Sequence, residues 1–202
     1  MIAIIDYGVG NLFSLASSLS YLGLDSCVSS DKTVIAKAEK LILPGVGAFY
    51  DAAKLLADSG LDITIKSEVK KGKPLLGVCL GMQLLFERGL EYGNHVGLGL
   101  LKGVVSPLTL DIPDNLKIPQ MGWNSLNIKT TSPLLQYTRE GEYFYFVHSY
   151  YAKGCEDSLL ASTEYGADVP AIVGKDNVYG CQFHPEKSGR AGLNVLRAFS
   201  EI

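Results

Sequence analysis

The sequence has few residues of the types that cross-link a fold or bind a metal ion. Four cysteines, three histidines and one tryptophan stand among its 202 residues. The cysteines, at positions 27, 79, 155 and 181, show no C-x-x-C spacing, which disfavours both a disulfide scaffold and a zinc site. We therefore expect no metal ion and no other cofactor.

Long apolar runs and clusters of basic residues are also missing. No stretch approaches the roughly 18 to 20 apolar residues of a membrane span. The N-terminus reaches Asp6 after a few apolar residues and lacks the basic leader and length of a signal peptide. Lys plus Arg total 18 against 21 Asp plus Glu, and no basic run suits a nucleic-acid backbone. These absences predict a cytoplasmic protein without a membrane or nucleic-acid partner.

Apolar residues, in contrast, are plentiful. They make up 47% of the chain, with 19% charged residues, a balance typical of a folded globular protein. Single cores extend to about 200 residues before chains divide, and the sequence contains no evident linker, repeat or low-complexity segment. We expect one domain over residues 1–202.

The first half alternates short apolar runs with amphipathic stretches, a pattern typical of parallel sheets covered by helices. Strands are predicted over 2–5, 40–43 and 74–78. Helices are predicted from a cap at Asn11 to Gly23, and over 48–58, 61–71 and 80–88.

From about Gly97 onward, short β-rich segments alternate with turn residues. Those over 103–110, 125–128 and 143–147 predict antiparallel additions, and a last strand over 178–183 precedes a closing helix over 192–199. The predicted fold class is therefore α/β, with a mostly parallel central sheet flanked by helices and extended by antiparallel strands.

Cys79 stands in a pattern that exposes a nucleophile. Gly77-Val78-Cys79-Leu80-Gly81 has the form G-x-nucleophile-x-G, whose glycines permit a sharp, strained turn from strand to helix. The N-terminus of the following helix would favour a thiolate and offer N–H groups to an oxyanion. The alternative is a core cysteine packed between two glycines, and the pentapeptide alone leaves both open.

His184 is the histidine best placed to act as the base for this thiol. It ends an apolar strand and is followed by Pro185 and Glu186. The strand ends carrying Cys79 and His184 would meet at the carboxyl edge of a parallel sheet, where such folds place their sites. Glu186 would then hold the imidazole tautomer, as the third member of a triad does. A solvated loop histidine beside a surface acid is the alternative.

A third glycine-rich segment follows another predicted strand. Pro44-Gly45-Val46-Gly47 would reach the same edge, and its glycines allow peptide N–H groups to turn toward an anion. By itself the segment also fits an ordinary turn.

Taken together, these three motifs resemble the triad class of glutamine amidotransferase domains, which has a flavodoxin-like fold. The resemblance implies that Cys79 attacks the side-chain amide of glutamine and forms a γ-glutamyl thioester, with His184 and Glu186 as base and orienting carboxylate. It also implies that the N–H of Leu80 and the loop of Gly45, Val46 and Gly47 stabilise the oxyanion. Gln83, Glu91 and the backbone at Ser149 would contact glutamine, whereas we expect a structural role for His148.

Further segments narrow the resemblance. Residues 6–11 (Asp-Tyr-Gly-Val-Gly-Asn), residues 119–124 (Pro-Gln-Met-Gly-Trp-Asn) and Lys187 are similar to the glutaminase subunits of imidazole glycerol phosphate synthases. In that family the glutaminase docks on a (β/α)8-barrel cyclase subunit and passes ammonia to it for histidine biosynthesis. The resemblance places Asn11, Trp123, Asn124 and Lys187 at or near the docking face, although a lone tryptophan is more often in a core and a lysine more often solvated.

Three alternatives remain at the level of sequence. The chain could serve another acceptor enzyme, in pyridoxal phosphate or anthranilate synthesis, which the Gly122-Trp123-Asn124 context disfavours. It could be a cysteine peptidase or thiol chaperone of related architecture, for which the pairing of Pro185 with Glu186 would be unnecessary. It could also be a catalytically silent module that binds a partner, against which the complete set of triad residue types argues.

Overall fold

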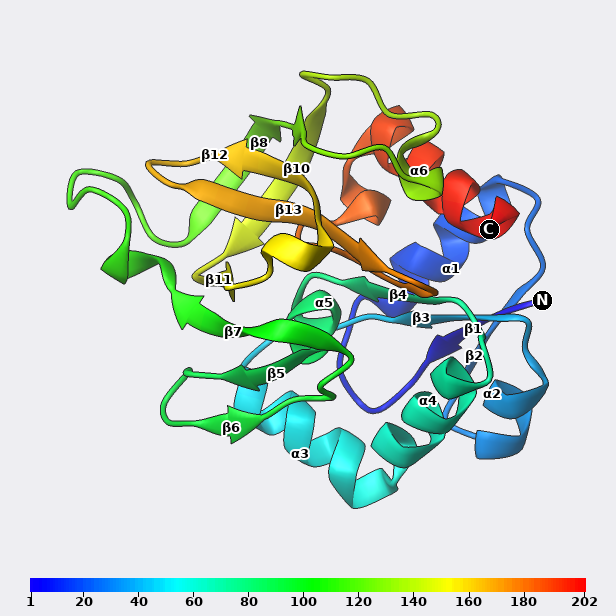
Figure 1. The fold of residues 1–202 in the computed structure, drawn as a ribbon. Coiled ribbons are helices and arrows are strands. Elements are labelled where there is room, and N and C mark those ends of the chain that lie inside the picture. Colours follow the sequence, from blue (N-terminus) through cyan, green and yellow to red (C-terminus); the bar gives the residue numbers. More distant parts are fainter.

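A computed structural model describes residues 1–202, and its largest element is an eight-stranded sheet with the order β2-β1-β3-β4-β14-β13-β12-β9 (Figure 1). The strands are β1 (Ile2–Ile5), β2 (Ser26–Ser29), β3 (Lys40–Leu43), β4 (Leu75–Val78), β5 (Phe86–Gly89), β6 (His95–Val96), β7 (Leu101–Pro107), β8 (Gln120–Ser125), β9 (Asn127–Ile128), β10 (Tyr143–His148), β11 (Tyr150–Lys153), β12 (Leu159–Glu164), β13 (Asp168–Lys175) and β14 (Val178–Cys181). The helices are α1 (Leu12–Tyr21), α2 (Lys32–Lys37), α3 (Phe49–Ser59), α4 (Leu61–Lys70), α5 (Leu80–Leu84) and α6 (Gly189–Glu201).

The β2-β1-β3-β4-β14 half of this sheet is parallel throughout. Its strands form where short apolar runs appear in the sequence, and β1 and β4 are buried along their whole length, as expected for strands covered on both faces. The predicted α/β class with a mostly parallel sheet is confirmed.

Helices cover both faces of the parallel half (Figure 1). Ala3 and Ile5 of β1 belong to a core cluster shared with α2, α3 and α4. Ile2 and Ile4 belong to a second cluster shared with α1 and α6. The alternation of side chains along a strand therefore divides the core into two layers.

Antiparallel strands extend the molecule beyond β14, as predicted. β13, β12 and β9 continue the main sheet in antiparallel fashion. β8 and β10 form a two-stranded sheet, and β11, β7, β5 and β6 form a four-stranded one. The short α5 contacts both β4 and β5, so it lies between the main and the four-stranded sheet (Figure 1).

Two predicted elements depart furthest from the structure, while others, such as the strand predicted over 178–183, which ends at Cys181, differ by a few residues at an end. The helix expected over 80–88 ends at Leu84, and the chain from Phe86 instead pairs with β7 in parallel. The segment over 125–128 is not one strand, because buried Leu126 separates β8, which pairs with β10, from β9, which pairs with β12. In both cases pairing with strands distant in the sequence determines the structure, and the local pattern of apolar residues does not.

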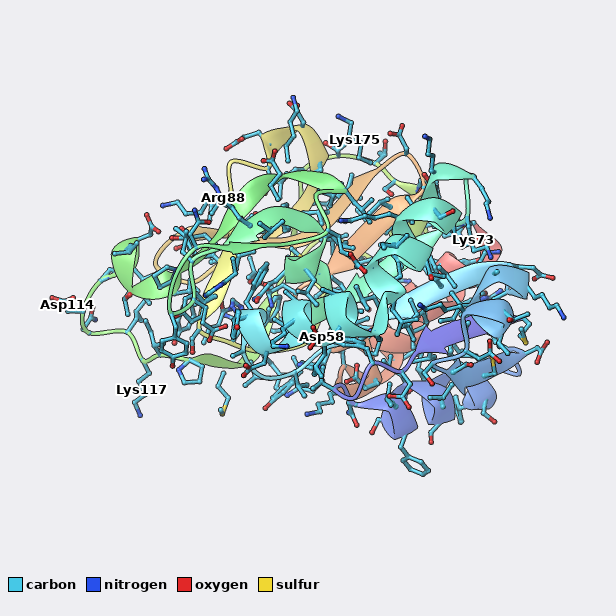
Figure 2. All side chains as sticks on the ribbon, turned by 90° about the horizontal axis from the view of Figure 1, so that it is seen from below. Asp58, Lys73, Arg88, Asp114, Lys117 and Lys175 are labelled. Atoms are coloured by element: carbon cyan, nitrogen blue, oxygen red, sulfur yellow. The ribbon has the colours of Figure 1, made fainter.

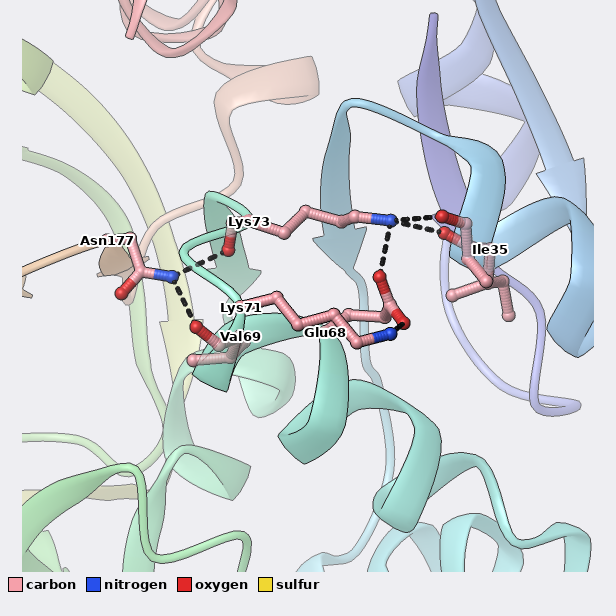
Figure 3. A network of polar contacts seen from close by, with 7 residues as sticks. Ile35, Glu68, Val69, Lys71, Lys73 and Asn177 are labelled. Carbon is pink, nitrogen blue, oxygen red and sulfur yellow. Dashed lines mark hydrogen bonds and ion pairs between the residues drawn. The ribbon is translucent and has the colours of Figure 1, made fainter.

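A network of polar contacts connects the segments that precede β4 and β14, at the amino-terminal ends of these two strands (Figure 3). The Asn177 amide donates to the carbonyls of Val69 and Lys73. The Lys73 ammonium donates to the carbonyl of Ile35 and pairs with Glu68, which is almost fully buried. These bonds tie α2, α4 and the β13–β14 turn together.

Charged side chains are spread around the periphery rather than concentrated on one face. In Figure 2, Asp114 and Lys117 lie at one end of the molecule and Lys73 lies near the other. No helix is both long enough and apolar enough to cross a membrane.

Candidate active site

Cys79 occupies a strained turn between β4 and α5. Its φ of 54° and ψ of −111° lie outside the regions that residues with a side chain normally adopt. A Cβ on Gly77 would lie 2.7 Å from the carbonyl carbon of Gly81, and one on Gly81 would lie 1.9 Å from the Leu43 carbonyl oxygen. The two glycines are therefore required so that the turn can pack between β3 and β4.

His184 and Glu186 lie beside Cys79 because β14 is the neighbour of β4. Cys181 pairs in register with Val78, so both strands end at the same edge. His184 Nδ1 lies 2.9 Å from Glu186 Oε1, and the two side chains are 3% and 0% exposed. The short 3-10 turn Pro185–Lys187 begins with the proline and returns the carboxylate to the ring. The structure thus brings together all three predicted catalytic side chains.

The environment of His184 favours its protonated form. Burial opposes a charge on the ring, but the interactions with Cys79 and with Glu186 outweigh it and raise the pKa of His184 to about 10. An imidazole of this basicity can accept a thiol proton and retain it. Cys79 contributes most to this rise in the pKa of His184, and Glu186 adds to it.

A cavity of about 330 Å³ opens in front of Cys79, a size within the usual range for small-molecule sites. Most of the predicted site residues line it: Val46, Gly47, Cys79, Leu80, Gln83, Glu91, Ser149, His184 and Lys187. Pro119, Val147, His148 and Tyr150 complete the lining.

Gly45 does not line the cavity, although Val46 and Gly47 of the same segment do. It is buried against the turn, where a Cβ would lie 2.7 Å from the Gly81 nitrogen and 2.9 Å from Leu80 Cβ. Val46 is 43% exposed, and Gly47 has a φ of +93°. Gly45 therefore keeps the segment close to the nucleophile, and its two successors face the cavity.

The three residues predicted to contact the substrate all line the cavity, and two of them, Gln83 and Glu91, also form hydrogen bonds within the protein. Gln83 donates to the Tyr150 carbonyl at 2.8 Å. Glu91 Oε2 accepts the N–H of Phe49 at 2.6 Å and so caps α3, whose own N-cap residue Ala48 makes no side-chain bond. Ser149 lies between β10 and β11 and lines the cavity.

Sequence reasoning missed Gln182 and predicted only a structural role for His148. Gln182 is fully buried and its amide nitrogen lies 3.8 Å from Cys79 Sγ. His148 lines the cavity, and its Nε2 is buried without a hydrogen-bond partner. The available signal for Gln182 was a polar residue inside the otherwise apolar strand predicted over 178–183, because buried polar groups require partners.

Asn11 occupies the N-cap position of α1, but its side chain does not cap that helix. Instead its amide donates to Glu186 Oε1 at 3.1 Å, the same oxygen that His184 contacts. The predicted capping role is therefore wrong: the side chain is turned toward Glu186, and the Asn11 backbone, at φ −88° and ψ 59°, lacks the extended conformation that usually aims an N-cap oxygen at the helix N–H groups.

Of the remaining residues predicted for a partner surface, Lys187 lines the cavity, and Trp123 and Asn124 do not. Trp123 of β8 is 53% exposed and packs edge-on against Tyr145. Lys187 lies over the same Tyr145 ring, 6.0 Å from its centre. Asn124 is partly buried and accepts a bond from Gln120. The lone tryptophan is thus not a core residue, unlike most tryptophans.

Comparisons with known proteins agree on one family. Residues 3–201 match the family model described as glutamine amidotransferase class-I. A protein of Caldanaerobacter subterraneus subsp. tengcongensis, named imidazole glycerol phosphate synthase subunit HisH, is 52% identical, with 100% of this chain and 98% of the relative covered. A Bacillus velezensis protein of the same name is 53% identical over 100% of this chain and 96% of the relative.

Solved structures share the fold at much lower identity. A glutamine amidotransferase crystal structure has a TM-score of 0.77 and 20% identity, with 100% of this chain and 98% of that chain covered. A chain of PurLQS from Thermotoga maritima has a TM-score of 0.78 and 19% identity, with 99% and 97% covered.

Proposed function

Since the chain belongs to the class-I glutamine amidotransferase family and, within it, to the HisH subunits of imidazole glycerol phosphate synthase, we propose that Cys79, His184 and Glu186 carry out its hydrolysis of glutamine. The observation that carries this assignment is the strained Cys79 turn beside a buried His184–Glu186 pair. These are the parts that a thiol nucleophile needs: exposure to substrate, a base, and a group that orients the base.

The reaction proceeds in two halves. The Cys79 sulfur attacks the carbonyl carbon of the glutamine side-chain amide, and His184 takes the thiol proton. His184 then donates that proton to the departing nitrogen, so that ammonia leaves and a γ-glutamyl thioester remains. In the second half His184 deprotonates a water molecule, which attacks the thioester carbon and releases glutamate and the thiol.

The tetrahedral intermediates of both halves carry an oxyanion that requires N–H donors. We assign this role to the N–H of Leu80, at the free N-terminal end of α5, and to those of the Val46–Gly47 segment that lines the cavity opposite it. Losing one such donor typically lowers the rate about 100- to 1000-fold.

Glutamine binding is assigned to the far side of the cavity. The Glu91 carboxylate suits the α-ammonium of the substrate, and the backbone at Ser149, with Gln83, suits its polar head. Because Glu91 also caps α3, it is held in place before glutamine arrives.

The partner we propose is the (β/α)8-barrel cyclase subunit, which would receive the ammonia and release imidazole glycerol phosphate and aminoimidazole carboxamide ribotide. Two side chains of β8 are exposed and apolar, Met121 at 63% and Trp123 at 53%. Met121 pairs in register with Val147, which lines the cavity, and Trp123 packs on Tyr145, the ring that Lys187 also contacts, so they support a docking face of the expected kind. The HisH relatives favour this partner over pyridoxal phosphate or anthranilate enzymes. The free thiol of Cys79 suits the reducing cytoplasm.

Replacement of the nucleophile tests the proposal. Cys79→Ala should abolish glutamate formation while ammonia-dependent synthesis by the assembled enzyme continues. Glutamate release is measured on the assembled enzyme, with Cys27→Ala as a control because Cys27 is a free cysteine outside the cavity. Glutaminase activity that survived in Cys79→Ala would overturn the assignment.

A further inference from the structure

We propose that Gln182 is a positioning residue for the nucleophile, which donates a hydrogen bond to the Cys79 sulfur and favours its thiolate. The inference rests on the proposed role of Cys79. Gln182 follows β14 directly, two residues before His184, and is fully buried. Its amide nitrogen lies 3.8 Å from Cys79 Sγ.

The direction of this bond follows from a chain of donors and acceptors that starts at the Tyr150 carbonyl. A carbonyl oxygen accepts only, so Gln83 must face it with its amide nitrogen, at 2.8 Å. The same nitrogen has a second hydrogen, which points to Gln182 Oε1 at 3.1 Å. Gln182 therefore faces Gln83 with its oxygen and Cys79 with its N–H group. The reverse orientation would place two amide nitrogens against each other.

Such a donor matters because the sulfur has a competing contact. The thiol lies 3.9 Å from the Val147 carbonyl, an acceptor that favours the protonated form. The Gln182 N–H acts in the opposite sense, since hydrogen bonds to an ionised acceptor are stronger than neutral ones. Gln182 thus stabilises the thiolate form of Cys79, and His184 carries the proton that the thiol has lost.

The titratable groups around the sulfur come from several elements. Tyr7, after β1, and Cys181, at the end of β14, interact electrostatically with Cys79, as does His184. Glu91, His148 and Lys187 line the same cavity. A change at Gln182 leaves all of these in place, so a change in thiol reactivity can be attributed to the lost donor.

Alkylation of Cys79 by iodoacetamide, followed by mass spectrometry of its peptide as a function of pH, tests the inference on the full-length chain without glutamine turnover. Gln182→Met keeps the side-chain length and removes the donor. We expect its alkylation rate at neutral pH to fall about tenfold or more, and its pH midpoint to rise by about one unit. Gln182→Glu, which places a carboxylate oxygen against the sulfur, should raise the midpoint further and keeps the test decisive if Gln182→Met folds poorly.

Asn177→Leu is the matched control. Asn177 directly precedes β14, at the end opposite to Gln182, and its amide donates hydrogen bonds to the carbonyls of Val69 and Lys73 (Figure 3). The Asn177→Leu variant should have a lower melting temperature than the wild type and the same pH midpoint for alkylation of Cys79.

Folded Gln182→Met and Gln182→Glu variants with the wild-type midpoint would overturn the inference. A Cys79→Ala variant that still hydrolysed glutamine would instead overturn the proposed function, so the two failures are distinguishable.

Discussion

At the scale of single residues, the site depends on which atoms of a side chain face which partner. Tyr150 offers one carbonyl oxygen to two donors, Gln83 Nε2 and His148 Nδ1. The imidazole of His148 must therefore carry its proton on Nδ1, which leaves Nε2 as an unpaired acceptor on the cavity side. Burial lowers the pKa of His148 to about 4, with the nearby His184 acting in the same direction, so the ring stays neutral while His184 becomes charged.

The depressed pKa of His148 predicts a loss of stability in mild acid. In the unfolded chain the ring takes up a proton near pH 6.5, while the folded ring resists protonation down to about pH 4. Stability is therefore complete above pH 6.5 and falls as the pH decreases toward 4. Between pH 7 and pH 5 we expect a contribution of about 1 to 2 kcal/mol from this residue.

Urea unfolding at both pH values measures this contribution. His148→Asn, which retains a donor for the Tyr150 carbonyl, should lose less stability between pH 7 and pH 5 than the wild type. An equal loss in both proteins would show that His148 is not the residue responsible.

At the scale of elements, the Pro44–Gly47 segment and the Cys79 turn are fitted to each other. Tyr7 donates to the Pro44 carbonyl at 2.7 Å, and its hydroxyl would lie 2.9 Å from a Cβ on Gly45. Asn11, from the same loop after β1, donates to Glu186. The loop between β1 and α1 therefore contacts both the Pro44–Gly47 segment and Glu186, and a displacement of this loop would affect both.

Gly45→Ala tests this fit. The backbone of Gly45 needs no left-handed conformation, so the substitution acts through space alone: the new methyl group would lie 2.7 Å from the Gly81 nitrogen. Separation of the segment from the turn should lower the kcat for glutamine about 100-fold, comparable to the loss of one oxyanion donor.

Steady-state glutamate release with the partner bound measures the effect. Gly23→Ala serves as the control, because Gly23 has a φ of +71° with nothing within 4 Å. It should cost about 1 kcal/mol of stability without changing kcat. Wild-type turnover in Gly45→Ala would contradict the argument.

At the scale of the whole molecule, the cavity opens beside an exposed apolar face that a partner subunit would cover. Val46 lines the cavity and is 43% exposed. Its neighbour Gly47 has no side chain that would restrict a change of backbone conformation. We therefore expect slow glutamine hydrolysis by the isolated chain and faster hydrolysis when the cyclase subunit and its ligand are bound. Equal, fast turnover with and without the cognate barrel would refute this coupling.

Trp123→Ala tests the docking face itself. Loss of a half-exposed tryptophan from the proposed docking face should weaken binding of the cyclase subunit about tenfold or more, as measured by titration calorimetry. Ile63→Ala on α4 is the matched control, since Ile63 is 70% exposed on a helix that covers the face of the sheet away from α1 and α6. Unchanged affinity in Trp123→Ala would exclude this face.

The sequence by itself determined the α/β class, the strained turn at Cys79 and the pairing of His184 with Glu186. These features depend on local patterns: apolar runs for parallel strands, glycines around a strained turn, and a proline that returns a carboxylate to its histidine. Only the tertiary structure decided that Gln182 faces Cys79, that Asn11 binds Glu186 rather than capping α1, and that Phe86 leaves the helix for a strand. Each of these depends on a contact between segments distant in the chain, 103 residues apart for Gln182 and Cys79 and 175 for Asn11 and Glu186, and no local pattern specifies such a contact.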